Sequence, residues 1–221
     1  ATPSPTPSVT PTETATASVT PTPSNTVTPS ETATPEPTPT ATAGPTDCGT
    51  APATGCRLPA VGGKAPFALR AGTTSRGNLL TWKWMPGSPT LLADFGDPTA
   101  GDALALCVYD ANGLLTAATI PGGGTCGTQP CWRATTSTFK YKRRDGAPDG
   151  VLTVQLKEGL AAGKARINLK AKGENLAMPP LADVASPVTV QLRAATGACF
   201  EAVYSTPFRK HDARTLQDKA D

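Results

Sequence analysis

The sequence predicts an all-β protein: an antiparallel two-sheet β-sandwich, immunoglobulin-like or jelly-roll, with an extended Thr/Pro-rich segment of polyproline II type before it and a short helical C-terminal tail. Three observations predict this. Residues 1–47 are almost entirely Thr, Pro, Ala and Ser, the residues after them alternate apolar and polar side chains, and that second part contains six cysteines. The chain therefore divides into a low-complexity stalk at 1–47, a disulfide-linked sandwich at 48–206 and a polar tail at 207–221.

The stalk lacks the residues that a folded segment buries. It holds 16 Thr, 11 Pro, six Ala and five Ser, and no Leu, Ile, Phe or Trp. Such a composition cannot offset the entropy of ordering, and its prolines favour an extended chain. Exposed hydroxyls on such a chain are typical of O-glycosylated stalks, a bare linker being the alternative, and no Asn-x-Ser/Thr acceptor occurs. The candidate O-glycosylation sites are Thr10, Thr12, Thr20, Thr22, Thr28, Thr38 and Thr40.

Charge differs between the stalk and the rest of the chain. The stalk carries Glu13, Glu31, Glu36 and Asp47 and no Lys or Arg, whereas residues 48–221 carry 20 basic and 13 acidic residues, a formal net charge of +7. Opposite charges favour self-association in which the stalk of one subunit lies on the domain of the next. The 174 residues after the stalk are enough to bury a core without help from a partner.

The six cysteines form an even set without the CxxC spacing of zinc sites, so disulfides are expected. Fifteen pairings are possible. Short Gly/Pro/Thr-rich loops favour Cys48 with Cys56 and Cys126 with Cys131. The remaining pair, Cys107 with Cys199, would then link two strands across the core.

Disulfides indicate an oxidising compartment, and we expect the protein to be extracellular or attached to the cell surface. The chain begins at Ala1 without a charged and then apolar leader, so we expect that a leader has been removed or that the chain is a fragment. No run approaches the roughly 18 apolar residues that a membrane span needs, so we expect no membrane span.

Most of the domain shows the period-two alternation of half-buried antiparallel strands. The run KARINLKAKG at 164–173 is the clearest case, and Gly159 and Gly163 separate it from VLTVQLK at 151–157, which predicts a hairpin. Only FRKHDARTLQDKAD, at 208–221, looks helical. The other runs expected to form strands are PFALRA, NLLTWKWM, TLLADFG, ALALCVYD, LLTAATI, TSTFKYK, PVTVQLRA and ACFEAVYS.

Two tryptophans at spacing two lie on one face of a predicted strand, where they would either stack on sugar rings or pack in the core. Trp82 and Trp84 share their face with Leu80, while Thr81 and Lys83 share the other, so core packing is the better interpretation. Trp132 follows a cysteine in a predicted loop. It is the better candidate for an exposed aromatic, and covering the disulfide is its alternative role.

The run FKYKRR at 139–144 predicts a local basic surface. Lys140 and Lys142 share one face of a strand, and Arg143 and Arg144 lie at the following turn. Together with Trp132 they are the candidate ligand contacts, for an acidic polysaccharide or for the acidic stalk of a neighbouring subunit; a solvated strand face is the alternative. Because we expect export, we do not expect nucleic acid as a partner.

Acidic residues gather in two Gly/Pro-rich turns, but neither turn matches the spacing of an EF-hand loop. Asx-turn formation is therefore expected in place of a calcium site, and we expect no metal or cofactor. The residues concerned are Asp94, Asp97, Asp102, Asp145 and Asp149.

Catalysis finds no support in the sequence, so we expect no enzyme activity. The only histidine, His211, lies beside Asp212 in the polar C-terminal tail, and neither GxSxG nor HExxH occurs.

An ordered series of motifs resembles the C-terminal domain of uncharacterised secreted bacterial proteins that often carry Thr/Pro-rich linkers. The resemblance covers residues 56–221 and implies a terminal module that ends at Asp221. It implies no activity, ligand or catalytic residue. The motifs are CRLPA, LLTWKWMPGSPTLLADFGDP, ALCVYD, GTQPCWR, a DG-V-L hairpin, GKARINLKAKG, VTVQL and CFEAVYS with a KAD-type ending.

The leading hypothesis is a non-enzymatic extracellular structural protein, the subunit of a bacterial surface fibre or filament with a glycosylated stalk. A stalk that cannot order itself implicates a partner, which packing between subunits would supply. The alternative is a carbohydrate-binding or adhesive module that the linker tethers to a larger secreted protein. Burial of Trp82 and Trp84 would weigh against the alternative.

Overall fold

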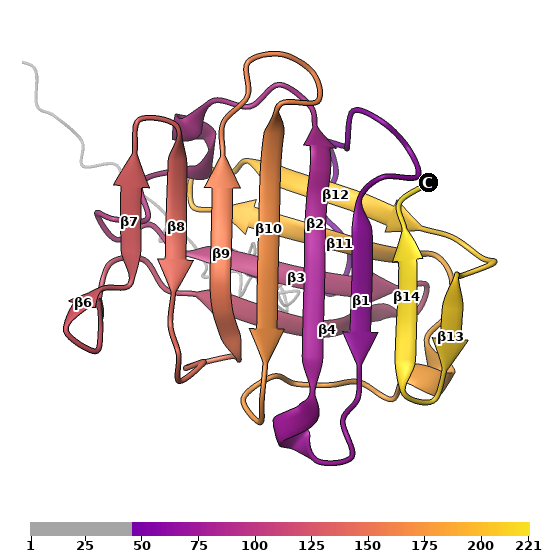
Figure 1. The fold of residues 1–221 in the computed structure, drawn as a ribbon. Coiled ribbons are helices and arrows are strands. Elements are labelled where there is room, and N and C mark those ends of the chain that lie inside the picture. The colour runs from indigo at the N-terminus through magenta and orange to yellow at the C-terminus, as the bar shows by residue number, and fades with distance from the viewer. Residues whose placement is uncertain (1–45) are drawn as a thin grey trace, which may run out of the picture. The chain divides into compact units, whose positions relative to one another are not determined.

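The computed structural model describes residues 46–221, and it confirms an antiparallel two-sheet sandwich (Figure 1). The stalk up to residue 45, with its seven candidate threonines, lies outside the described residues. The large sheet has the strand order β13 (Lys210–Asp212), β14 (Thr215–Lys219), β1 (Pro66–Arg70), β2 (Leu79–Gly87), β10 (Ala165–Lys172), β9 (Val151–Lys157), β8 (Thr138–Lys142) and β7 (Trp132–Thr135).

The small sheet has the order β12 (Cys199–Tyr204), β11 (Val188–Ala194), β3 (Leu104–Asp110) and β4 (Gly113–Ile120). Its strands run across those of the large sheet (Figure 1). This is the orthogonal class of sheet packing, whereas immunoglobulin domains and jelly rolls align their sheets. The predicted hairpin between β9 and β10 is confirmed, with Val154 opposite Leu169. The minor elements are the ribbon β5 (Thr125–Cys126) and β6 (Gln129–Pro130) and the 3₁₀ turns η1 (Ser75–Gly77), η2 (Leu92–Phe95) and η3 (Leu181–Asp183).

The core lies between the two sheets, and aromatic side chains from β2 and β12 join them. Trp82 and Trp84 are fully buried, which confirms their predicted role in the core. The indole N–H of Trp82 donates a hydrogen bond of 2.9 Å to the Tyr204 hydroxyl, and that of Trp84 donates to the Glu201 carbonyl at 3.0 Å. The Trp84 ring meets Phe200 edge-on, with centroids 5.3 Å apart. Both indoles therefore bury their apolar area without leaving a polar group unpaired.

The C-terminal residues form a β-hairpin, so the predicted helix is wrong. Strand β14 pairs with β13 and adds to β1, with Leu216 opposite Leu69. Leu216 and Ala220 are buried. The sequence looks polar and helical because the core-facing position between these two residues is occupied by Asp218, which is also buried. The folded domain thus extends to the end of the chain, and no separate tail follows residue 206.

The run TLLADFG at 90–96 was predicted as a strand and instead forms η2. The Asp94 carboxylate accepts a hydrogen bond from the Leu91 amide at 2.7 Å and one from the Arg57 guanidinium at 2.5 Å. The hydrogen bond from Arg57 holds the pKa of Asp94 below its usual value. The local hydrogen bond from Leu91 competes with strand pairing, and the more distant Arg57 also holds the turn.

The disulfides are Cys48–Cys107, Cys56–Cys199 and Cys126–Cys131, so only the last of the three predicted pairs is right. Cys107 and Cys199 lie on β3 and β12, which β11 separates. Two strand spacings place them about 10 Å apart, and a disulfide spans less than about 7 Å between Cα atoms. Each cysteine pairs instead with one from an N-terminal segment, residues 47–57, which we call the strap.

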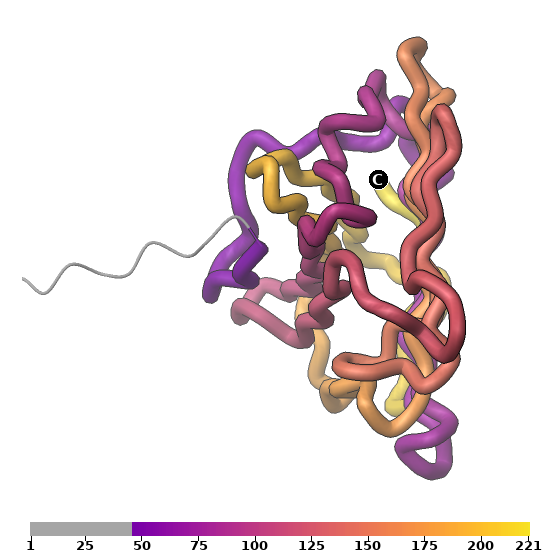
Figure 2. The backbone as a smooth tube through the Cα atoms, turned by 90° about the vertical axis from the view of Figure 1, so that its left-hand side faces the viewer, coloured from indigo at the N-terminus to yellow at the C-terminus, as the bar shows by residue number. Residues whose placement is uncertain are grey.

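The strap crosses the outer face of the small sheet, on the side away from the large sheet (Figure 2). The fully buried Gln191 side chain accepts a hydrogen bond from the Ala53 amide at 3.0 Å and donates one to the Ala53 carbonyl at 2.8 Å. Arg57 then forms a parallel bridge to β12. Beneath the strap, Ala105, Cys107 and Tyr109 form a second buried cluster that Cys48 contacts. The three disulfides indicate an oxidising environment.

The buried Tyr204 makes the free energy of unfolding depend on pH in the alkaline range. Burial raises its pKa far above the ordinary value of 10. Above pH 10 the unfolded chain loses this proton while the folded protein keeps it. The free energy of unfolding therefore falls by about 1.4 kcal/mol for each pH unit above 10 through this residue alone.

We predict that Tyr204→Phe lowers the free energy of unfolding at pH 7 by about 1–3 kcal/mol, because the Trp82 N–H loses its acceptor. The variant should lose less stability between pH 10 and 12 than the parent does. Urea denaturation of both proteins from pH 7 to 12 measures how steeply each free energy of unfolding falls with pH. The other buried tyrosines contribute equally to both proteins. Equal alkaline slopes would contradict the assignment.

Candidate functional site

The outer face of the large sheet carries positive charge without negative charge over six neighbouring strands. Strands β7, β8, β9, β10, β2 and β1 contain no Asp or Glu. Every Lys and Arg in them is exposed and lies at a position that faces away from the core. We call these nine residues the basic face: Arg70, Lys83, Arg133, Lys140, Lys142, Lys157, Arg166, Lys170 and Lys172.

Like charges lie directly opposite each other on the basic face. Arg133 pairs in register with Lys140, and Arg166 with Lys157. None of the nine cations forms an ion pair with another residue in the described part of the chain. Cross-strand pairs of like charge destabilise a sheet, so this arrangement has a cost in stability that a bound anion would relieve.

Amide and hydroxyl side chains lie between the cations. One row across the strands reads Lys83, Asn168, Gln155, Lys140 and Arg133. With strands about 4.8 Å apart, Lys83 and Lys140 are roughly 14 Å apart at their Cα atoms. The row thus offers charges for anions and hydrogen-bonding groups for uncharged polar atoms between them.

A second row, one pleat further along the strands, repeats the arrangement. It runs Thr81, Lys170, Thr153 and Lys142, again with polar side chains between cations. Two such rows side by side give the face room for an extended ligand that crosses several strands.

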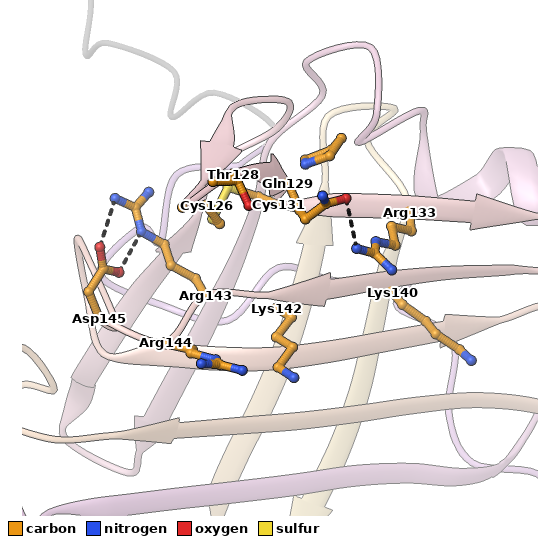
Figure 3. Close-up of a pocket in the computed structure, with 12 residues that line it drawn as sticks. Cys126, Thr128, Gln129, Cys131, Arg133, Lys140, Lys142, Arg143, Arg144 and Asp145 are labelled. Carbon is orange, nitrogen blue, oxygen red and sulfur yellow. Dashed lines mark hydrogen bonds and ion pairs between the residues drawn. A yellow bond between two sulfur atoms is a disulfide. The ribbon is translucent and has the colours of Figure 1, made fainter.

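One end of the basic face borders a hollow of about 700 Å³ between the β5–β6 ribbon and strands β7 and β8 (Figure 3). The ribbon is closed by Cys126–Cys131 and turns at Gly127, whose φ of 73° suits a two-residue hairpin. Five of the residues that line the hollow are cations and one is an acid: Arg133, Lys140, Lys142, Arg143, Arg144 and Asp145.

Within residues 46–221, two of these cations donate side-chain hydrogen bonds to another residue and three do not. Arg133 donates to the Gln129 side chain at 3.2 Å, and Arg143 donates to Asp145 at 2.7 Å. The latter hydrogen bond lowers the pKa of Asp145 and raises that of Arg143, so both stay charged at neutral pH. The side chains of Lys140, Lys142 and Arg144 bond to no other residue of 46–221, and Figure 3 shows them without partners.

Four of the five predicted ligand contacts lie together in this hollow: Lys140, Lys142, Arg143 and Arg144. The fifth, Trp132, does not: it is the first residue of β7 and is 3% exposed. Its ring packs on Tyr141 and its N–H donates to the Pro121 carbonyl at 2.8 Å. The prediction of an exposed aromatic is therefore wrong, because the residue lies at a core-facing position opposite Tyr141.

Sequence reasoning missed Arg133 and the cations of β1, β2, β9 and β10. They lie far from FKYKRR along the chain, and only the strand order brings them together. The lack of acids in all six strand sequences was the signal that could have found them.

Asx-turn formation is confirmed at two of the five acidic residues, Asp97 and Asp145. Asp97 accepts a hydrogen bond from the Thr99 amide at 2.9 Å, and Asp145 accepts one from the Ala147 amide at 3.1 Å, both in Asx-type geometry. Asp102 accepts a hydrogen bond from the Asp97 amide within its own turn, and Asp149 accepts one from the Thr119 amide of β4. Within residues 46–221, no three His, Cys, Asp or Glu side chains come close enough to hold a metal ion.

His211 lies in β13, where its Nε2 is 2.7 Å from the Leu181 carbonyl and its ring meets Phe208 edge-on. Within the described part of the chain, no helix is both long and apolar enough to cross a bilayer. Comparisons with protein-family models, with curated proteins and with solved structures found no match. The resemblance to secreted bacterial domains stays a prediction, and function rests on the site itself.

We predict that Lys157→Glu raises the free energy of unfolding by about 0.2–1 kcal/mol at low salt, because it replaces a like-charge pair with an ion pair to Arg166. Lys157→Gln, which only removes the repulsion, should give a smaller gain. Urea denaturation in 10 mM and 500 mM salt measures both, and the gains should shrink at high salt. A loss of stability in Lys157→Glu at low salt would contradict the described register.

Proposed function

We propose that this protein is a non-enzymatic extracellular adhesion module whose basic face binds acidic polysaccharide, with the Thr/Pro-rich segment as an O-glycosylated tether at the cell surface. The nine exposed cations across six strands that lack acids carry this proposal. A surface of one sign attracts a polymer of the other sign over a length that no single pocket covers.

The polar groups between the cations favour a sugar polymer over other polyanions. Asn168, Gln155 and Thr153 lie in the rows between lysines, where they are placed to bond hydroxyl groups. The usual aromatic platform for uncharged sugars is absent from the six strands, because Trp82, Trp84 and Trp132 are buried. Recognition of neutral carbohydrate by ring stacking is therefore not proposed.

The position of the strap supports a tethered role. The chain enters the described domain along the outer face of the small sheet, and the basic face lies on the other side of the molecule (Figure 2). The point at which a tether would join the domain, residue 46, thus lies on the side opposite the basic face. His211 bonded to a backbone carbonyl supports a structural role for the one histidine.

A fibre subunit is the second candidate. The basic face is complementary in charge to the acidic residues of the stalk, so the stalk of a second copy is an alternative occupant. A peptide that copies residues 27–40, with Glu31 and Glu36, tests this directly. If this peptide binds more tightly than polysaccharide and the full chain forms filaments in electron micrographs, the fibre is favoured.

We predict that the full chain binds polygalacturonate in 0.1 M salt and does not bind neutral dextran. Lys140→Glu with Lys142→Glu should weaken binding at least about fourfold, because two attractions of about 0.2–1 kcal/mol each become repulsions of similar size. Binding should also weaken as salt rises to 0.5 M. Biolayer interferometry on immobilised polymer measures the choice of polymer, the effect of the double variant and the effect of salt.

Lys64→Glu with Arg76→Glu is the matched control. It changes the net charge equally at exposed positions outside the six strands and should alter affinity less than twofold. Equal losses in both double variants would show only a dependence on net charge and would overturn the proposed face. Tighter binding of single-stranded DNA than of polygalacturonate would overturn the proposed ligand.

A further inference from the structure

The strap is covalently fixed at two points that lie just inside the domain's N-terminal entry. Cys48 bonds to Cys107 on β3, and eight residues later Cys56 bonds to Cys199 on β12. Between them, two hydrogen bonds join the strap to the rest of residues 46–221, both between Ala53 and Gln191. The first covalent attachment therefore comes within three residues of the start of the described chain.

The first attachment leads into the middle of a sheet. Strand β3 is flanked by β11 and β4, and Cys107 lies opposite Gln191 on one side and Ala117 on the other. Its neighbours Leu106 and Val108 point into the main core. Tension that enters at Cys107 is thus shared by two ladders of hydrogen bonds and by the core packing of β3.

The disulfide also makes a shortcut along the chain. Cys48 and Cys107 are 59 residues apart in sequence, and β1 and β2 lie between them. Seven of the nine cations of the basic face come after Cys107, on β7 to β10. A pull between the stalk and a ligand on these strands need not pass through the strap, β1 or β2.

We infer that the Cys48–Cys107 bond is a mechanical anchor: it transfers tension from the stalk directly to β3 and keeps the strap and strands β1 and β2 out of the path of the force. The Cys56–Cys199 bond is a second stop, which takes the tension only if the first is lost. This inference rests on the proposed role of the Thr/Pro-rich segment as a tether, and it does not depend on which ligand the domain binds.

The first test cuts the strap without touching a cysteine. A protease site is inserted between Thr54 and Gly55, both exposed, and cleaved after folding. Optical tweezers then pull between the N-terminus and a click-reactive residue at position 157 on β9. The cut and uncut proteins should open at the same force, because tension does not pass residues 49–55. Opening of the cut protein at a lower force would overturn the inference.

The second test moves the force onto the strap. In Cys48→Ala with Cys107→Ala, the strap should peel away before the domain opens. The traces should show an early extra step that releases eight residues, with a contour length of roughly 28 Å at about 3.5 Å per residue, less the distance that the folded strap already spans. Cys126→Ser with Cys131→Ser is the matched control, since it also lacks one disulfide but keeps both strap bonds, and it should show no early step.

The absence of the early step in the Cys48/Cys107 variant, in a protein that folds, would show that the strap bears force by itself and would overturn the anchor. If that variant does not fold, the cut-strap experiment decides alone. The protein is attached covalently at both pulling points, the N-terminus and position 157. Failure to bind polysaccharide would therefore leave this test unaffected.

Discussion

The packing of two indole rings determines what the large sheet presents to solvent. Trp82 and Trp84 fill the space between the sheets, and the Trp82 N–H bonds to Tyr204 of the opposite sheet. Because side chains alternate along a strand, a slip of one residue would expose both rings and bury Lys83. The ladder carries the same register from β2 to β10, β9 and β8. The place of almost every cation on the basic face thus follows from the packing of two tryptophans.

The alternation of single strands was readable from the sequence, and the relations between distant strands were not. Runs such as KARINLKAKG predicted the strands, the hairpin and the burial of Trp82 and Trp84 correctly. The cysteine pairing depended on the fact that β11 lies between β3 and β12, which no local pattern shows. The C-terminal hairpin was missed because it contains few apolar residues. Their pattern indicates a strand only when the pairing of β14 with β1 is known.

The candidate site shows the same division. FKYKRR was found because its four basic residues lie close together in the sequence, and all four line one hollow. Arg133 and Lys157 were missed, because their significance comes from the like charges placed opposite them. Such pairs reduce stability, and the large core and three disulfides offset that loss. The cost of this face to the fold is an argument for the ligand that we propose.

The edge strands of both sheets determine how copies of the domain can pair with one another. The large sheet ends in β7 and β13, of four and three residues, and Arg57 bridges the edge strand β12 of the small sheet. At the remaining edge, β4, the Thr119 amide is bonded to Asp149. Long open edges act as templates for strand pairing between molecules, and short or covered ones do not. The short edges at β7 and β13 and the bridged edge at β12 therefore offer a second copy few backbone groups to pair with, and the eight-residue β4 is the edge at which strand pairing between copies is least hindered.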